Sequence, residues 1–228
     1  MRINADFEQR VAVHSARMPW LDSPMAGVSR RPLDRVGDEV ARATSIVRYA
    51  PASRFSSHVH TGGEEIFVLE GVFQDEHGDF PAGSYIRNPP QSSHTPGSSA
   101  GCVIFVKLWQ FEAQDPTHVR LDSNFMQAIT AADHPGVSII PLYMDQAEAV
   151  SIHHWQAGAV VDIDLPGGAE FLVLEGEFRE ADEVLSSQAW LRLPCESKLH
   201  AIAGSLGAKV WVKQGHMNRV DQEVARLP

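Results

Sequence analysis

The chain has 228 residues, of which 43% are hydrophobic and 21% charged, a composition typical of a globular protein that buries a substantial core. Its formal net charge of -10 argues against a nucleic-acid backbone or an anionic membrane surface as partner. No apolar stretch is long enough to span a bilayer, and residues 1–8 lack the apolar run of a secretory signal. Because Cys102 and Cys195 are too few for a disulfide framework, we expect a cytoplasmic protein.

Strand signals dominate when the chain is taken in order. Short runs of β-forming residues bounded by Gly, Pro or Ser predict strands, the clearest at 66–69, 102–108, 171–174 and 209–213. Turn signals recur between such runs, at 76–79, 81–83 and 166–168. Helix is predicted only near residues 124–132 and in the tail from Gln222. This pattern predicts an all-β protein built as a sandwich or barrel.

The most informative feature is an internal repeat. Residues 62–73, GGEEIFVLEGVF, return as residues 167–178, GGAEFLVLEGEF, with eight of the twelve positions identical. Shorter matches flank this one, pairing 27–33 with 136–142, 44–46 with 150–152 and 106–107 with 212–213. The period is that of a domain rather than of a solenoid unit. We therefore predict two tandem domains, residues 1–112 and 135–228, joined by a connecting segment at 113–134.

Four potential metal ligands accompany the first copy. His58 and His60 are two residues apart, so on a strand both side chains point to the same face. Glu64 follows after a Gly-containing turn that can bring it back beside them, and His94 arrives from another strand or loop. Three imidazoles and a carboxylate that converge in a barrel make a site for one divalent transition metal. We predict that these four residues are its ligands.

The repeat also guides the choice between two adjacent carboxylates. Glu65 is kept as Glu170 in the second copy, where the histidine pair is missing, whereas Glu64 has become Ala169. A residue that is kept where the metal site is missing is expected to be structural. We therefore predict Glu64 as the ligand and keep Glu65 as the second choice.

The second copy is predicted to be a structural barrel with a degenerate metal site. Opposite the histidine pair the alignment offers only Ile163 or Asp164 and Leu165 or Pro166. One inserted residue would bring His200 opposite His94, but a single imidazole does not make a transition-metal site. The remaining histidines are expected in hydrogen-bonded core or surface positions (His153, His154) or facing solvent (His14, His77, His118, His134, His216).

The motifs of the first copy resemble those of the cupins. Residues 58–71, HVHTGGEEIFVLEG, resemble the first cupin motif, and residues 83–94, GSYIRNPPQSSH, resemble the second. The second motif usually has glycine where this chain has Gln91. The resemblance implies a small antiparallel jelly-roll barrel, also called a double-stranded β-helix. With the repeat, it implies two tandem cupin barrels, a bicupin.

A narrower resemblance is to the ChrR-type cupin, carried by four segments: SIVRYAP at 45–51, HVHTGGEE at 58–65, RNPP at 87–90 and SHTP at 93–96. In that family a zinc-binding cupin forms the C-terminal half of an anti-sigma factor that responds to singlet oxygen. The resemblance implies that the family's zinc ligands fall on His58, His60, Glu64 and His94. The family's anti-sigma module carries its own His-x-x-x-Cys-x-x-Cys motif. The residues before the first cupin segment contain no cysteine, so we expect no sigma-factor inhibition by that module.

Two functions are compatible with this metal site. Zinc is the expected ion, and the four ligands could complete its tetrahedral coordination. Such a site favours sensing of oxidative stress or small ligands in transcription-linked regulation. Cys102 is a candidate oxidation target. Iron, manganese or nickel would keep coordination positions open, and with iron the alternative is a dioxygenase acting on a small organic substrate.

No acid–base pair beyond the ligands is evident, and the catalytic residues stay unassigned. Candidate pocket residues are Arg48, Tyr85, Arg87 and Gln110. The expected partners are a small-molecule ligand or oxidant and a second copy in a homodimer.

Overall fold

The structure is a computed structural model that describes every residue from Met1 to Pro228, and the chain divides into two compact units. Unit 1 contains Met1–Ala5, Pro19–Phe125 and Asp221–Pro228, and unit 2 contains Asp6–Met18 and Met126–Val220. The division expected from the repeat, at residues 112 and 135, assigns both chain ends differently. The difference arises because an early strand pairs within unit 2 and the C-terminal tail folds with unit 1.

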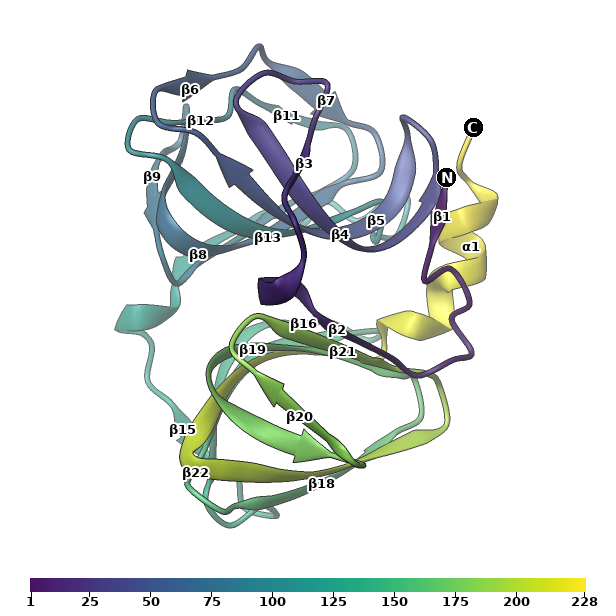
Figure 1. The fold of residues 1–228 in the computed structure, drawn as a ribbon. Coiled ribbons are helices and arrows are strands. Elements are labelled where there is room, and N and C mark those ends of the chain that lie inside the picture. Colours follow the sequence, from purple (N-terminus) through teal and green to yellow (C-terminus); the bar gives the residue numbers. More distant parts are fainter. The chain divides into compact units, whose positions relative to one another are not determined.

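Unit 1 is built almost entirely of antiparallel strands. Its main sheet runs in the order β1-β4-β5-β13-β8-β10-β14, while β7 and β11 pair separately in a two-stranded sheet. Figure 1 draws most of this unit from purple to teal, and its C-terminal residues 221–228 in yellow. Its elements are β1 (Arg2–Ile3), β3 (Leu21–Asp22), β4 (Val28–Gly37), β5 (Ala41–Tyr49), β6 (Ser53–Arg54), β7 (His58–His60), β8 (Glu64–Asp75), β9 (Gly78–Pro81), β10 (Ser84–Asn88), β11 (Ser92–His94), β12 (Gly97–Ser98), β13 (Cys102–Leu108), β14 (Val119–Asp122) and the 3-10 turn η2 (Ser123–Phe125).

Unit 2 repeats this plan in a single sheet. Its strands run in the order β15-β16-β17-β22-β19-β21-β2, with β18 and β20 attached at the side of β22 and β19. The elements are β2 (Val11–His14), η1 (Ser15–Arg17), β15 (Ile129–Thr130), β16 (Val137–Met144), β17 (Ala149–Trp155), β18 (Val160–Leu165), β19 (Ala169–Glu180), β20 (Glu183–Ser186), β21 (Ala189–Leu193), β22 (Ser197–Gln214) and η3 (His216–Arg219). The helix α1 (Val220–Ala225) follows and belongs, from Asp221, to unit 1.

The strand boundaries follow the repeat residue for residue. The three strands β8, β9 and β10 recur as β19, β20 and β21, each with both ends displaced by the same interval as the repeated GG segments. One difference concerns the region of the predicted ligands. Where unit 2 runs the long strand β22 against β18, unit 1 has the short pair β7 and β11. The prediction of an all-β chain made of two duplicated barrels is confirmed.

Each unit has its own apolar core, and the two cores differ in size. In unit 2 a cluster of buried residues that includes Trp155, Phe171 and Phe178 draws on nearly every strand. In unit 1 the corresponding cluster is smaller and centres on Ile66, Phe73 and the strand β13. Partly buried side chains of β5 complete it.

The connecting segment departs from the sequence expectation. A helix was expected at 124–132, but the structure has only the 3-10 turn η2 and the short strand β15 there. Strand β14, just before, pairs with β10 and extends the sheet of unit 1. Sheet hydrogen bonding thus overrides the weak local helix signal. The helical expectation for the tail is confirmed by α1.

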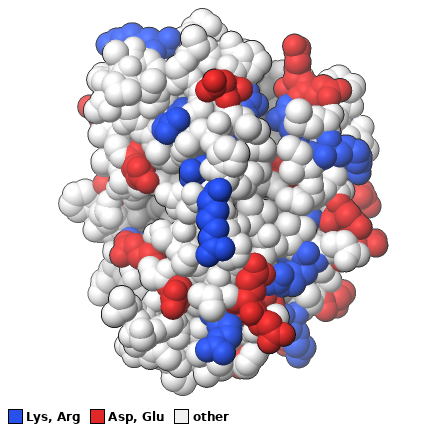
Figure 2. All heavy atoms as spheres, viewed as in Figure 1, with Lys and Arg blue, Asp and Glu red and all other residues white.

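Two further features concern the charged surface and the helices. Figure 2 shows acidic and basic side chains interspersed over the face drawn there. No helix in the structure combines the length and the apolar composition that crossing a membrane requires.

Candidate metal site

The histidine pair lies on β7, a three-residue strand that pairs with β11. In this register His58 is opposite His94, so three imidazoles gather at one end of the barrel. The ring centroids of His58, His60 and His94 are 4.7 to 5.3 Å apart. Nε2 of His60 lies 2.9 Å from Nε2 of His94. One ring nitrogen from each residue falls within 4.8 Å of the others, so this cluster could hold a metal ion.

Glu64 joins the cluster because of the double-glycine turn that precedes β8. Gly63 has a φ of +80°, and a Cβ there would lie 2.6 Å from the Phe111 ring, so the turn requires glycine. The chain then directs Glu64 toward the imidazoles. Its Oε2 atom lies 3.3 Å from Nε2 of His60 and 3.4 Å from Nε2 of His94.

The donor atoms of His60, Glu64 and His94 fit a divalent transition metal. Ligand atoms about 2.1 Å from one ion lie about 3.0–3.4 Å apart in octahedral or tetrahedral arrangements, close to the separations among His60, Glu64 and His94. Oε2 of Glu64 is buried and accepts no hydrogen bond. Such an atom is costly to bury unless a cation or donor engages it. A cation among these donors would remove that cost.

Burial and neighbouring charges shift the pKa values of the two buried imidazoles in opposite directions. Burial lowers the pKa of His60, and the neighbouring imidazoles add to this effect against the opposing Glu64 carboxylate. His60 is therefore held as the neutral imidazole that binds metals. For His94, burial alone would lower the pKa, but the hydrogen bond to Asp75 and the charge of Glu64 raise it.

Asp75, at the end of β8, orients His94. Its Oδ2 atom lies 3.4 Å from Nδ1 of His94, and its Oδ1 atom accepts the backbone N–H of His77 at 2.7 Å. The Asp75 side chain is 0% exposed. With Nδ1 occupied by this carboxylate, Nε2 of His94 is the nitrogen that faces Glu64, an arrangement common around metal-binding histidines. Sequence reasoning missed Asp75, and comparing the copies offers no signal, because its counterpart Glu180 is also acidic.

Glu65 has a different and structural role. Its Oε1 atom accepts a hydrogen bond from the Tyr85 hydroxyl at 2.5 Å. In unit 2 its counterpart Glu170 accepts one from Nε1 of Trp190 at 3.0 Å, and the imidazole of His216 lies 2.9 Å away. The same carboxylate therefore braces the neighbouring strand in both barrels. The expectation that His216 faces solvent is wrong, because it is fully buried beside Glu170.

In unit 2 the four predicted ligand positions carry apolar side chains. Ile163 is opposite Leu199, just as His58 is opposite His94. The strand pairing thus keeps the repeat interval constant through Leu199. In chain order the replacements are Ile163, Leu165, Ala169 and Leu199, all of them in the apolar core or packed against it. These positions offer no metal-binding atoms.

The other histidines of unit 2 have structural surroundings. The idea that an insertion aligns His200 with His94 is wrong, since the register shows no insertion before it. His200 is exposed, with Nδ1 2.6 Å from the Asp162 carboxylate. His153 is buried and lies 2.9 Å from the Ser151 hydroxyl, as expected for a hydrogen-bonded core histidine.

A cavity of about 220 Å³ lies beside the cluster in unit 1. His58 and Glu64 form part of its wall, and strands β4, β5 and β13 supply most of the rest. His58 is the exposed member of the triad, whereas His60 and His94 are buried. A small molecule in this cavity would therefore reach the site from the side of His58 and Glu64.

The four residues expected to line the pocket do not line this cavity. Arg87 pairs with Asp115 and lies over the Phe111 ring. The remaining three have these partners: Tyr85 bonds Glu65, Gln110 bonds the carbonyl of Ala43, and Arg48 lies over the ring of Trp20. Successive side chains of a strand point to opposite faces, and a shift of one residue exchanges them. Sequence alone could not fix that choice here.

Cys102 is a poor candidate for oxidation. It is 4% exposed, and burial raises the pKa of its thiol to about 11, against a lowering effect of the Ser98 hydroxyl. Because the thiolate is the reactive form, a thiol held protonated in this way reacts slowly with oxidants. Any response to oxidants would thus have to involve other groups.

Comparison with solved structures defines the fold class. The chain resembles a "putative dioxygenase" from Nostoc punctiforme with a TM-score of 0.74 at 18% identity, covering 90% of this chain and 82% of that one. It also resembles the pirin YhhW of Escherichia coli in complex with nickel(II), with a TM-score of 0.62 at 13% identity, covering 90% and 98%. An oxalate decarboxylase from Bacillus subtilis matches with a TM-score of 0.62 at 10% identity, covering 90% and 76%. The fold is that of a bicupin.

Comparison of the sequence with protein families adds a narrower identification. Residues 8–112 match the ChrR cupin-like domain. That range holds the three imidazoles, Glu64 and Asp75. The N-terminal half of the chain is thus a ChrR cupin-like domain within a bicupin fold. No curated protein matches the chain at a significant level.

Proposed function

We propose that the N-terminal barrel binds one divalent transition metal through His58, His60, Glu64 and His94, and that the bound site responds to small ligands or oxidants. The observation that carries this proposal is the buried Oε2 atom of Glu64. It accepts no hydrogen bond and lies within 3.4 Å of two imidazole nitrogens. Zinc is the expected ion from the likeness to the ChrR cupin-like domain, and iron, manganese and nickel suit the same donors.

A bound metal would supply a Lewis-acid centre able to coordinate a ligand or an oxidant. The residues of the chain divide the remaining work. His60 and His94 are buried, and Asp75 fixes the orientation of His94. His58 is exposed on a three-residue strand. Its imidazole has one hydrogen-bond partner, the backbone carbonyl of Ser56, which lies 3.2 Å from Nδ1. His58 is therefore the ligand that an incoming molecule would displace at the lowest cost. This asymmetry supports a sensing role centred on the metal rather than on a thiol.

A second candidate function is that of a dioxygenase using iron at the same site. The cavity favours it, because a substrate there would contact His58 and Glu64 directly. The likeness to the Nostoc protein supports it at the level of the fold.

Metal analysis of two matched variants tests the ligand set. Glu64→Gln should lower the metal content of the purified protein from about one ion per chain to a small fraction, because an amide binds a transition metal far more weakly than a carboxylate. Glu65→Gln, its neighbour, should keep the metal, since the amide oxygen can still accept the Tyr85 hydroxyl. Equal loss in both variants, or full metal in Glu64→Gln, would contradict the assignment.

The same preparation distinguishes the two functions. About one zinc per chain that singlet oxygen or peroxide releases stoichiometrically would support sensing. About one iron per chain, with oxygen consumption on adding small phenols or diketones, would support the dioxygenase.

A further inference from the structure

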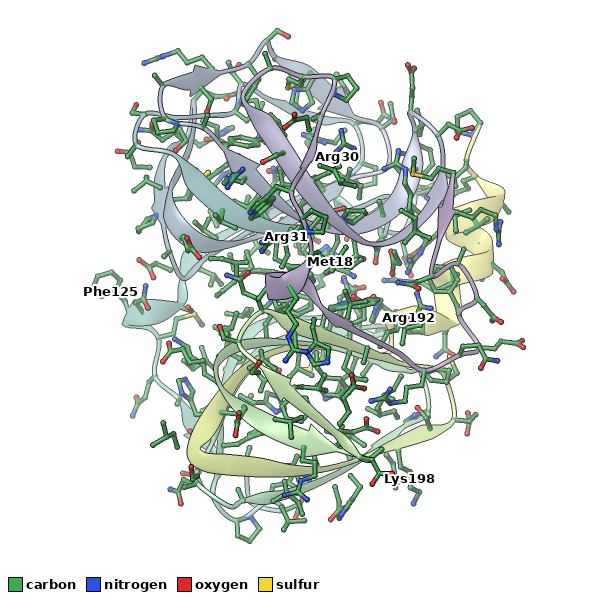
Figure 3. All side chains as sticks on the ribbon, viewed as in Figure 1. Met18, Arg30, Arg31, Phe125, Arg192 and Lys198 are labelled. Carbon is green, nitrogen blue, oxygen red and sulfur yellow. The ribbon has the colours of Figure 1, made fainter.

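Two arginines line the cavity beside the candidate metal site. Arg30 and Arg35 both belong to β4, and both contribute to the cavity wall. Figure 3 labels Arg30 together with its neighbour Arg31. As successive strand residues, these two point to opposite faces, and Arg31 instead lies over the ring of Trp20 at 4.1 Å. The cavity thus receives two positive charges from one strand.

Strand register places these arginines on the same sheet face as the carboxylate ligand. Arg30 is opposite Val47 and Arg35 is opposite Ala43. On the next strand, β13, Ile104 is opposite Val47 and Leu108 is opposite Ala43. Leu108 in turn is opposite Glu64 on β8. One continuous face therefore runs from the arginines across apolar side chains to the candidate metal ligand.

Neither arginine has a carboxylate within ion-pair distance. Arg30 donates to the Ser23 hydroxyl at 2.6 Å, and Arg35 donates to the backbone carbonyl of Gly37 at 3.2 Å and to that of Asp38. Burial lowers the pKa of Arg35, and repulsion from Arg30 lowers it further against a weaker effect of Asp38. Two guanidinium groups that repel each other at a cavity wall make a binding site for an anion.

The rest of the cavity suits a small molecule with an apolar part. Its volume of about 220 Å³ is below the ~300–1,000 Å³ typical of pockets for drug-sized ligands. Val47, Ile104 and Leu108 provide an apolar wall. Tyr49 also lines it. Burial, together with the Glu64 carboxylate, raises the pKa of Tyr49, so its phenol stays a neutral donor.

The second barrel provides an internal comparison. In the repeat, Arg30 corresponds to Ile139 and, by the same interval, Arg35 corresponds to Met144. Ile139 packs against the apolar core of unit 2. The barrel that lost the four metal donors has thus also lost both cavity arginines, which ties the two features to one site.

We propose that the cavity of the N-terminal barrel binds a small organic carboxylate, held at its anionic end by Arg30 and Arg35 and packed by its apolar part against β5 and β13 beside the metal ligands. This assigns a ligand class to the small-molecule response proposed above and rests on that function for its role. The anion site itself is defined by residues that are not metal ligands.

Calorimetric titration of the metal-loaded protein tests this with three probes: benzoate, its neutral isostere benzamide, and acetate, which keeps the carboxylate but lacks the ring. Benzoate should bind saturably, and both other probes should bind on the order of tenfold or more weakly. Arg30→Gln and Arg35→Gln should each weaken benzoate binding by about the same factor and leave the metal content unchanged. Arg54→Gln, an exposed arginine outside the cavity wall, should bind benzoate like the wild type.

Three outcomes would overturn the proposal: no saturable binding of benzoate, equal affinities for benzoate and benzamide, or unchanged benzoate affinity in both cavity variants. Arg30→Gln keeps the test valid if Arg35→Gln fails to fold, since the Arg30 guanidinium donates a hydrogen bond only to the Ser23 hydroxyl. Metal analysis separates this inference from the proposed function. Arginine-dependent benzoate binding by a wild-type protein that retains no metal would uphold the anion site and refute the metal function. A metal-loaded protein that does not bind benzoate would refute the anion site and leave the proposed metal function standing.

Discussion

Two adjacent glutamates on β8 illustrate how one residue of spacing separates two roles. Glu64 points to the cavity face, where it meets the imidazoles, and Glu65 points to the other face, where it accepts the Tyr85 hydroxyl. The copy without the histidines predicted this division, because it keeps Glu65 as Glu170 and replaces Glu64 by Ala169. The role of Glu65 follows from a contact that both barrels share, whereas Glu64 as a metal ligand stays a prediction.

Asp75 gives a residue-scale prediction about metal affinity. Asp75→Asn should weaken metal binding on the order of 10–100-fold, because the amide no longer fixes His94 with a charged acceptor. Competition with a chelator of known affinity measures this. Asp79→Asn is the matched control, since Asp79 is exposed and accepts only the Gln74 amide at 2.6 Å. Wild-type affinity in Asp75→Asn, or an equal loss in Asp79→Asn, would show that Asp75 does not position the ligand.

At the scale of elements, the turn between β10 and β11 carries the most informative irregularity. The second cupin motif usually has glycine where this chain has Gln91, and Gln91 has a φ of 69°. Its counterpart Glu196 in unit 2 has a φ of 60°. Left-handed backbone is strained for residues with a Cβ. The turn is kept nonetheless, because the backbone N–H of Gln91 donates to the carbonyl of His60 and so ties β11 to the histidine strand.

Relieving that strain should stabilise the protein. Gln91→Gly should raise the free energy of unfolding by up to about 1 kcal/mol, as the relief of strain exceeds the extra entropy of glycine in the unfolded chain. Urea denaturation monitored by fluorescence measures the change. Ser93→Gly, at an exposed position on β11, should lower stability, because there glycine brings only the entropic cost. A destabilised Gln91→Gly variant would mean that the side chain contributes more than the strain costs.

The predicted elements differ in how well local sequence defined them. The strand expected at 102–108 is β13 with the same ends, because a run of apolar and β-branched residues there is buried between two neighbouring strands. The helix expected at 124–132 is absent, because the preceding strand β14 pairs with β10 and residues 129–130 form β15, which pairs with β16. Local preference decided the first case and sheet pairing the second.

At the scale of the whole molecule, one strand plan has been filled in two ways. Unit 1 has polar donors, two arginines and a cavity, whereas unit 2 has apolar side chains at the matching positions. Duplication thus produced one barrel with a polar cavity and one with a larger apolar core. The buried His153 is the exception in unit 2 and has consequences for its response to acid.

Burial lowers the pKa of His153 to about 4, with smaller effects from His134 and His154. The unfolded chain protonates histidine near pH 6.5, so between these values the unfolded state binds more protons and stability rises with pH. The contribution of neutral His153 to the free energy of unfolding is about 3 kcal/mol. It is complete above about pH 6.5 and is lost as the pH falls toward about 4.

Replacing His153 should remove this dependence. His153→Gln should be less stable than the wild type near neutral pH, and the difference should shrink by about 3 kcal/mol toward pH 4. Denaturation in urea across this range measures it. His200→Gln, which removes an exposed histidine from the same unit, should show a nearly constant difference from the wild type. A constant difference for His153→Gln as well would refute the predicted effect of burial.

The sequence by itself determined the duplication, the strand-rich fold class and the identity of the gathered histidines. These are properties of local pattern and of similarity between two segments of one chain, so no knowledge of distant contacts was needed. Glu64 was separated from Glu65 by the same comparison. The replacement of Arg30 by Ile139 was equally visible in the repeat and could have indicated the cavity arginine.

Only the tertiary structure decided which side chains share a face. Asp75 contacts His94, which lies nineteen positions further along the chain. Arg35 lies on the same sheet face as Glu64 because of three strand pairings and a β-bulge in β4. Because strand side chains alternate, a bulge or a shift of one residue moves a charge from the cavity to the opposite face. That is why Arg48 and Arg87 were wrongly expected in the pocket. Their place was set by register, which forms only when distant strands pair.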